Sequence, residues 1–228
     1  MILCLVGSSF AELILITLIS INIAEKKEMD LGHRVVTTGI FKDPVQHEVQ
    51  VGKYGLEADA VCDDRHHGGL DQAVYIYRAE DYDWWSNQLQ QPITPGTFGE
   101  NLTIRGIAEP ELMIGDRVSL GTVLLEITAP RIPCSVFSAR MGKANFLKAF
   151  LKAERSGFYC RVLTPGALQT GASGAVITTE LDSISTNEFY RDLQQKISAK
   201  KIEKYLSLPI DERSRRDFQK QLQNVAKS

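Results

Sequence analysis

The sequence predicts a mainly β domain followed by a small α-helical unit, and two observations lead to this division. Before residue 180, short runs rich in β-branched and aromatic residues alternate with turn residues, as in domains built from many strands. From residue 188 onward there is no glycine and one proline, Pro209, while residues that favour helix are frequent. A length of 228 residues suits one large domain with an appendage.

The overall composition narrows the classes of function. The 26 lysines and arginines nearly balance the 28 aspartates and glutamates, so no overall basic charge is present to hold nucleic acid. The four cysteines form no CxxC pair and are too sparse to staple a chain of this length. We therefore predict a reduced, cytoplasmic protein without a nucleic-acid partner.

The first 24 residues are mostly apolar and raise the question of a signal segment or a membrane anchor. No lysine or arginine precedes this run, and Glu12 and Asn22 interrupt it, whereas a secretory segment begins with basic residues. We expect instead a buried first strand at 15–23 with a short loose extension ahead of it, and no membrane partner. The predicted division is 1–18 for the extension and strand start, 19–182 for the main domain and 183–228 for the helical unit.

The main domain is expected to combine many strands with two helices. Strands at 34–41 and 48–51 flank a turn at Asp43-Pro44, because proline presets φ. A helix over 79–89 places Tyr82, Trp85 and Leu89 on one stripe, which should face the core. The other predicted elements are strands at 73–77, 102–104, 117–120, 123–128, 157–163 and 175–179, a hairpin turn at Gly121 and a helix over 144–152.

The helical unit is predicted to contain three short helices. Ser185 and Glu188 have the spacing of a capping box, which starts the first helix. The second helix covers 200–206 and ends before Pro209, and the third covers 211–225.

The segment 62–71, Cys-Asp-Asp-Arg-His-His-Gly-Gly-Leu-Asp, concentrates polar chemistry. Gly68 and Gly69 allow backbone conformations in which amides approach an anion closely. The Cys, Asp and His side chains are also ligand types for zinc or iron, although their spacing matches no closed zinc site. A solvated polar loop is the structural alternative.

The segment 130–134, Pro-Arg-Ile-Pro-Cys, holds one thiol and one guanidinium in a stiff backbone frame. Arg131 keeps its charge at any relevant pH and favours the thiolate of Cys134, which suits a nucleophile or a metal ligand. A buried, inert cysteine in a proline-rich loop is the alternative. Cys160, in an alternating apolar run, is expected to be a core residue.

A third segment, 95–102, combines two glycines with Thr97 and Asn101. Such a loop offers amides and side-chain donors to an oxyanion or to the edge of a heterocycle. Loops of this composition also connect strands in many β proteins, so the segment indicates a site only together with the others.

Taken together and in this order, five segments resemble the MOSC domain, the C-terminal domain of molybdenum cofactor sulfurases, and most closely its YiiM-type subgroup with a three-helix extension. They are 55–59, 67–74, 98–102, 114–116 and 130–134. The resemblance implies a β-barrel-like main domain. It also implies a pterin-based molybdenum cofactor (molybdopterin), with Cys134 as the catalytic residue and the molybdenum ligand. The cofactor-binding residues that it suggests are His67, Gly68, Gly69, Thr97, Gly99, Asn101 and Arg131.

The YiiM-type resemblance further implies an oxidoreductase that reduces small N-hydroxylated compounds, such as hydroxylaminopurines. Two positions depart from the family pattern. Ala58 stands where a glycine usually follows Leu-Glu, so a turn with positive φ there is strained or rebuilt. Val136 stands where YiiM-type proteins often have lysine, which removes one cation from the site.

Two other classes of function stay open at this point: a sulfurtransferase with a Cys134 persulfide, and a non-catalytic carrier of the cofactor. A reductase would need electrons from a separate flavin or iron–sulfur protein, because no four-cysteine cluster spacing and no GxGxxG after a strand occurs in the sequence. A basic landing site for that partner is expected on the helical unit, at Lys200, Lys201, Lys204, Arg213, Arg215 and Arg216.

Overall fold

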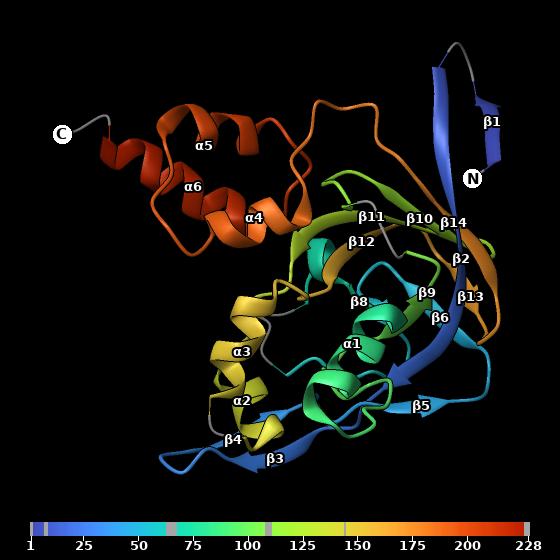
Figure 1. Ribbon diagram of the computed structural model, residues 1–228, viewed down its shortest axis with the longest axis vertical. Helices are drawn as coiled ribbons and strands as arrows, with labels where there is room; N and C mark the ends of the chain where they lie inside the picture. Colours follow the sequence, from blue (N-terminus) through green and yellow to red (C-terminus); the bar gives the residue numbers. More distant parts are fainter. Residues whose placement is uncertain (1, 7–8, 63–67, 108–110, 144, 226–228) are drawn as a thin grey trace.

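A closed β-barrel forms the centre of the computed structural model, which describes residues 2–6, 9–62, 68–107, 111–143 and 145–225 (Figure 1). Within these ranges seven strands form the ring, in the order β2 (Ser9–Ile23), β14 (Ser173–Ile177), β10 (Arg117–Leu120), β11 (Val123–Pro130), β12 (Phe158–Thr164), β8 (Val74–Arg78) and β9 (Leu102–Arg105). Strand β9 pairs with β2 and closes the ring. Neighbouring strands are antiparallel except β8 and β9, which are parallel because helix α1 (Ala79–Leu89) lies in the crossover between them.

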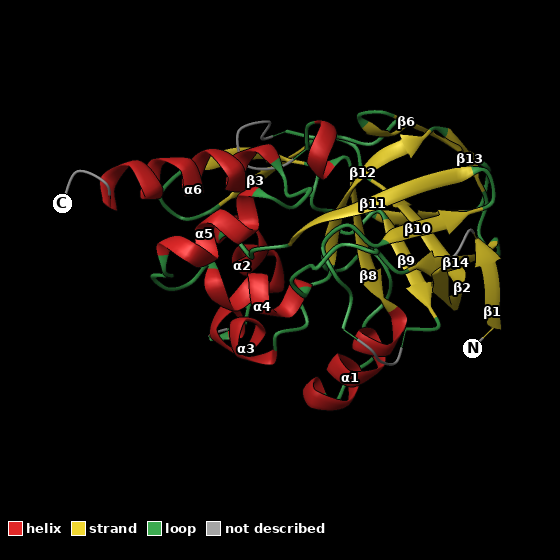
Figure 2. Ribbon diagram, turned by 90° about the horizontal axis from the view of Figure 1, so that it is seen from above, coloured by secondary structure: helices red, strands yellow, loops and turns green. Residues whose placement is uncertain are grey.

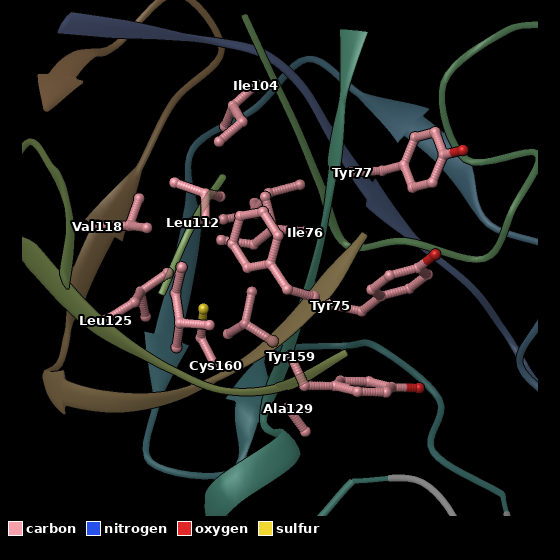
Figure 3. Close-up of a cluster of buried hydrophobic side chains, with 14 of the residues drawn as sticks. Tyr75, Ile76, Tyr77, Ile104, Leu112, Val118, Leu125, Ala129, Tyr159 and Cys160 are labelled. Atoms are coloured by element: carbon pink, nitrogen blue, oxygen red, sulfur yellow. The ribbon is translucent and has the colours of Figure 1, made fainter. Parts of the chain in front are cut away.

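Aliphatic side chains from facing strands fill the barrel interior. Ile76, Ile104, Val118 and Leu125 are fully buried, and Figure 3 shows them converging on one another. Cys160 is fully buried in the same group, as predicted, and burial raises the pKa of its thiol well above the ordinary value. The expected mainly β, barrel-like fold is therefore confirmed.

Shorter strands extend the barrel sheet or form small sheets beside it. Strands β1 (Ile2–Val6) and β5 (Asp43–Val45) pair with β2, strand β3 (Lys27–Asp30) pairs with β4 (Val35–Thr38), and β6 (Val49–Gly52) lies between β7 (Gly55–Leu56) and β13 (Gly166–Leu168). The 3₁₀ helix η1 (Leu70–Gln72) precedes β8, and helices α2 (Ser135–Met141) and α3 (Phe146–Ala153) lie between β11 and β12.

A cluster of aromatic rings packs α1 against α2 and α3. Trp85 stacks on Phe150 with 5.7 Å between ring centroids, and Phe137 meets Phe150 edge-on at 4.7 Å. Phe98, from the loop before β9, contacts Phe137 at 5.8 Å. Burying several large rings in offset and edge-on pairs stabilises this layer strongly.

Helices α4 (Thr186–Asp192), α5 (Ala199–Leu206) and α6 (Glu212–Val225) form the C-terminal unit, on the side of the barrel where α2 and α3 also lie (Figures 1 and 2). Ser185 caps α4 by accepting a hydrogen bond from the Glu188 amide at 3.1 Å, as its spacing predicts. The rings of Phe189, Tyr205 and Phe218 pack together with centroid distances of 4.5–5.9 Å and hold the helices to one another. None of the helices in the described ranges is both long and apolar enough to cross a membrane.

Most of the predicted strands, α1 and the C-terminal helices are confirmed, but two predictions near the N-terminus are wrong. Asp43-Pro44 does not form a turn; it belongs to β5, where Pro44 pairs with Asn22. This short strand lies off the main path of the sheet and pairs with β2 alone, an edge position in which proline's missing N–H is tolerated. The expected loose extension is instead strand β1, which forms an antiparallel hairpin with β2.

The sequence analysis also missed α2 and the short strands β3, β7 and β13. These strands contain two to four residues each, too few to show a clear alternation of apolar and polar positions. Helix α2 has seven residues and directly follows the proline-rich segment, which was interpreted as loop.

One buried carboxyl organises the loop that leads into β9. Glu100 accepts hydrogen bonds from the Gly96 amide at 2.6 Å, from the Tyr82 hydroxyl at 2.8 Å and from Thr103 Oγ1 at 2.8 Å. Burial raises the pKa of Glu100, and these hydrogen bonds act in the opposite direction. The carboxyl therefore fastens the loop to both α1 and β9.

Replacing Glu100 with glutamine should change the free energy of unfolding in a pH-dependent way. Because burial raises the folded-state pKa, the wild-type carboxyl stabilises fully below its unfolded pKa of about 4.3, and this contribution is lost as the pH rises through the folded pKa. Glutamine does not titrate, so urea unfolding should show Glu100→Gln gaining on the wild type as the pH rises above about 4.3. A difference independent of pH would contradict the prediction. As a control, Glu100→Ala, which also does not titrate, should show the same pH trend but lie about 2–3 kcal/mol below Glu100→Gln at each pH, because the buried donors lose their acceptor.

Candidate functional site

Loops at one end of the barrel enclose a cavity of about 730 Å³, a volume typical of ligand sites. Its walls come from segments far apart in the sequence: the β3–β4 hairpin, the loop after β7, the loop before β9, the loop after β11 and the start of α6. The charged and thiol side chains among the described lining residues are Arg34, Lys42, Asp59, Cys62, Arg131, Cys134 and Arg213. The cavity thus combines a thiol-containing loop with several cations.

Cys134 lies at the point where the proline-rich loop enters α2. Its backbone is extended, with φ −120° and ψ 178°, and its carbonyl accepts a hydrogen bond from the Ser138 amide at 3.0 Å. Its side chain makes no capping hydrogen bond to α2, and the half-buried residue lines the cavity. The thiol is therefore presented to the cavity by a backbone that Pro133 and the helix start both restrict.

Arg131 is a buried cation on the cavity wall, with 3% of its surface exposed. Its guanidinium carbon lies 4.2 Å from the ring centroid of Phe137 and 5.6 Å from that of Tyr75. Burial lowers the pKa of Arg131, but Tyr75, Tyr159 and Cys134 outweigh this and raise it, so the group stays charged. Among the described residues, its Nε and Nη1 atoms have no hydrogen-bond partner. Such a buried, incompletely partnered cation calls for an anionic ligand.

Lys42 and Asp59 form a buried ion pair in the cavity wall. Lys42 Nζ lies 2.5 Å and 2.6 Å from the two carboxylate oxygens of Asp59. Asn101 Nδ2 donates to the same carboxylate at 2.8 Å, and Asn101 Oδ1 accepts from the Tyr75 amide at 3.1 Å. Asn101 therefore ties β8 to the ion pair, and the pair is neutral as a unit.

The structure brings five of the predicted site residues to this cavity: Gly68, Gly99, Asn101, Arg131 and Cys134. Gly68 and Gly69 have positive φ angles of 82° and 79°, which their glycine identity permits, but Gly69 does not line the cavity. Of the other three predicted residues, Gly69 and Thr97 fall outside the lining, and His67 lies outside the described residues. Thr97 lies outside the lining and its carbonyl accepts from Arg140 at 2.8 Å.

The Gly99 amide donates within its own turn, to the Gly96 carbonyl at 3.0 Å. His67 and most of the predicted zinc or iron ligands of segment 62–71 lie outside the described residues. In the part of the chain that the structure describes, no group of three or more His, Cys, Asp or Glu side chains is placed to hold a metal ion.

Sequence reasoning missed Arg34 and Lys42, gave Arg213 a role only in the landing site for a partner, and assigned Asp59 no role beyond its motif. Arg34 and Arg213 have no motif around them and reach the cavity only through the tertiary fold. Asp59 belongs to the 55–59 motif, so this segment could have indicated Asp59 as a site residue. Val136 also lines the cavity, from the first turn of α2, and brings an apolar side chain there.

The family model of the MOSC domain matches residues 63–173. The uncharacterised protein YflK of Bacillus subtilis is 32% identical over 157 residues, which cover 69% of this chain and 71% of that protein. This chain belongs to the MOSC domain family. The likeness of this MOSC chain to known proteins extends to a solved structure. The crystal structure of YiiM from Geobacillus stearothermophilus is 31% identical in sequence, with a TM-score of 0.74, and the match covers 91% of this chain and 99% of that one.

This MOSC chain matches two further relatives, and it covers a different share of the length of each. Protein YiiM of Escherichia coli is 27% identical over 139 residues, 59% of this chain and 62% of that protein. A Gibberella moniliformis protein named Reductase is 32% identical over 162 residues, covering 68% of this chain but 28% of its own length. The chain therefore spans less than a third of that reductase.

The departure of Ala58 from the MOSC pattern has a structural counterpart. Ala58 has a φ of +63°, so the left-handed turn is kept although an alanine occupies it. The turn follows β7 and directs Asp59 into the ion pair with Lys42, while the Asp59 amide donates to the Leu56 carbonyl at 3.3 Å. The site therefore retains its geometry at the expense of local backbone strain.

Replacing Ala58 with glycine should raise the free energy of unfolding by about 0.5–1 kcal/mol, because glycine adopts this conformation without the Cβ penalty. In a chain of this size, the melting temperature should rise by about 2–4 °C per kcal/mol in calorimetry. Ala149→Gly, at an exposed position inside α3, is the matched control and should lose about 1 kcal/mol. The strain argument fails if both substitutions destabilise equally.

Proposed function

We propose that this protein binds a pterin-based molybdenum cofactor through the Cys134 thiolate and reduces small N-hydroxylated compounds. The observation that carries the proposal is the buried Arg131, incompletely partnered among the described residues, on the same cavity wall as Cys134. The name Reductase carried by one relative agrees with this reaction class.

The chemistry of the cavity fits such a group. Molybdenum accepts soft sulfur ligands, and Cys134 supplies a thiol in a rigid backbone frame. Arg131 is suited to a phosphate or another anionic group, since a guanidinium offers a planar fork of donors. Two-electron removal of an oxygen atom is the chemistry that the bound metal supplies. Reduction of an N–OH group to N–H takes up two electrons and two protons and releases water.

In this proposal the chain's own residues orient the ligand and set the charge of its surroundings. Tyr75 and Phe137 hold the Arg131 guanidinium between their rings, which limits its movement. The Lys42–Asp59 pair keeps a buried carboxylate from opposing the charge of an anionic ligand. The described lining residues therefore carry more positive than negative charge, although the chain as a whole carries a formal charge of −2.

The electrons would come from a separate flavin or iron–sulfur protein. Several residues of the basic landing site expected on the C-terminal helices make contacts within the chain. Lys201 pairs with Asp192 at 2.6 Å, Lys204 pairs with Asp182, and Arg215 donates to the Leu206 carbonyl at 2.8 Å. Several of these charges are thus committed within the chain.

Cys134→Ala should abolish molybdenum retention and turnover of an N-hydroxylated purine while leaving the fold intact. The measurement is molybdenum per chain in protein purified from a cofactor-producing host, followed by assay with a chemical reductant. Cys62→Ala is the matched control, since Cys62 is a second free cysteine on the same cavity wall without the proline frame, and it should keep the metal. Wild-type protein without molybdenum would overturn the proposal, and a persulfide on Cys134 would then point to sulfur transfer.

Arg131→Lys should lower cofactor retention by about tenfold although the charge is kept, because an ammonium group lacks the guanidinium fork. Pterin fluorescence of the denatured, oxidised protein measures the retained cofactor. Arg140→Lys is a suitable control, since Arg140 donates to the Thr97 carbonyl outside the cavity lining. Equal pterin content in Arg131→Lys and wild type would make Arg131 a purely structural residue.

A further inference from the structure

Basic residues accumulate in the segment around Cys134 and the two helices that follow it. Between residues 127 and 153 the sequence contains no aspartate and no glutamate. The basic residues of this segment are Arg131, Arg140, Lys143, Lys148 and Lys152. Arg131 lines the cavity, whereas the other four lie outside its described lining. The helices α2 and α3 thus carry positive charge without an acid of their own, in a chain whose formal charge is −2.

Three of these side chains point outward. Lys148 and Lys152 lie one turn apart on α3 and therefore share a face. The opposite face of α3 carries Phe146 and Phe150, which are buried in the aromatic cluster with α1 and α2. Lys143 lies between α2 and α3, and all three lysines are exposed. We call this surface, with Lys143, Lys148 and Lys152, the α2–α3 face.

The lysines of the α2–α3 face form no ion pair with any carboxylate that the structure describes. On the C-terminal helices, in contrast, Lys201 pairs with Asp192 at 2.6 Å. The first carboxylate after α3, that of Glu154, is bound to Arg191 at 2.8 Å, so it does not neutralise the face. The charges of the α2–α3 face are therefore available to another molecule.

Small side chains surround these lysines. Ser135, Ala139 and Ala149 are exposed on α2 and α3, and Gly142 is exposed at the end of α2. None of the large apolar side chains of α2 and α3, which the structure describes throughout, is exposed. A face of this kind suits a charge-steered, reversible encounter with an acidic protein. It lacks the exposed apolar residues with which an amphipathic helix enters a lipid surface.

The α2–α3 face also lies close to Cys134. This residue directly precedes α2, whose seven residues span about 10 Å, so Lys143 follows it after one short helix. Figures 1 and 2 show α2 and α3 beside each other, and Phe137 of α2 meets Phe150 of α3 at 4.7 Å. The same Phe137 lies against Arg131 in the cavity wall. A protein docked on this face therefore rests on the two helices that close the thiol loop.

We infer that the α2–α3 face, and not the C-terminal helices, is the docking surface for a small acidic electron carrier. The inference rests on the proposed function, because it assigns the surface at which the electrons for that reaction arrive. Each N–OH group that is reduced to N–H takes up two electrons and two protons and releases one water. Two carriers that give one electron each therefore dock and are oxidised in turn, and solvent supplies the protons.

The first test removes the three lysines together, in Lys143→Gln/Lys148→Gln/Lys152→Gln. With reduced flavodoxin, an acidic FMN protein, as the probe, kcat/KM for the carrier should fall about tenfold at low ionic strength, since each lysine adds a weak, salt-screened attraction. Turnover with dithionite should equal that of the wild type, because a small reductant needs no docking surface. High salt should remove the difference between the variant and the wild type.

The matched control is Lys196→Gln/Lys200→Gln/Lys220→Gln, which changes the net charge by the same amount. These three lysines are exposed on the C-terminal unit, and this variant should keep the wild-type kcat/KM for flavodoxin. Equal losses in the two triple variants would overturn the inference in favour of a net-charge effect. A loss of turnover with dithionite in the α2–α3 variant would also overturn it, since the lysines would then serve the site itself.

A binding measurement separates this inference from the proposed function. Protein from a host that makes no cofactor is titrated with oxidised flavodoxin in a calorimeter at low ionic strength. The Kd should rise about tenfold in the α2–α3 variant and stay constant in the control. Wild-type protein without molybdenum would sink the proposed reaction, yet this titration would still decide the docking surface.

Two results of the titration would overturn the docking surface. One is an unchanged Kd in the α2–α3 variant. The other is a wild-type protein that binds vesicles of phosphatidylglycerol through these lysines and does not bind flavodoxin, which would assign the face to a membrane surface instead.

Discussion

The buried guanidinium of Arg131 constrains the packing at one end of this barrel. Removing an ion from water costs several kcal/mol unless other groups replace the lost hydration. Arg131 is enclosed by the rings of Phe137 and Tyr75, and each ring is held in turn: Phe137 by the aromatic layer of α1 to α3, and Tyr75 by its hydroxyl bond to the Ser156 carbonyl at 2.7 Å. Helices, barrel and loops therefore meet around one charge, which is why the site and the core cannot be treated as separate parts.

In the same region, some charged groups are paired within the protein and others face the cavity. Asp59 is bound by Lys42 and Asn101, and Glu100 is enclosed by neutral donors, so neither carboxylate opposes an anion in the cavity. Among the described lining residues, the excess of positive charge therefore depends on the pairing of Asp59 with Lys42 and not on a basic chain. This arrangement is compatible with the mildly acidic overall composition of the chain.

Local pattern predicted much of the fold, and for definite reasons. The stripe of Tyr82 and Trp85 has the helical period, and the alternating run around Cys160 has the strand period, so both elements could be read from neighbouring residues. Arg131 and Cys134 were found because their prolines make a local signal. Pro44 led to a wrong prediction, because proline is frequent in turns but is also tolerated in a short edge strand. The positions of Arg213 and Lys42 at the cavity could not be predicted, because only the pairing of distant strands and helices brings them there.

The long strand β2 pairs with β9 on one side and with β14 on the other. In a growing polypeptide, residues 9–23 emerge before the other strands of the ring, while β14 is complete only once Ile177 has been added. At typical rates of synthesis, about 10–30 s separate the two events. Until then the N–H and C=O groups of β2 that pair with β14 are without their final partner, and such an edge is a template for pairing with other chains. The interval before the ring closes is therefore the period in which this edge is open to pairing with other chains.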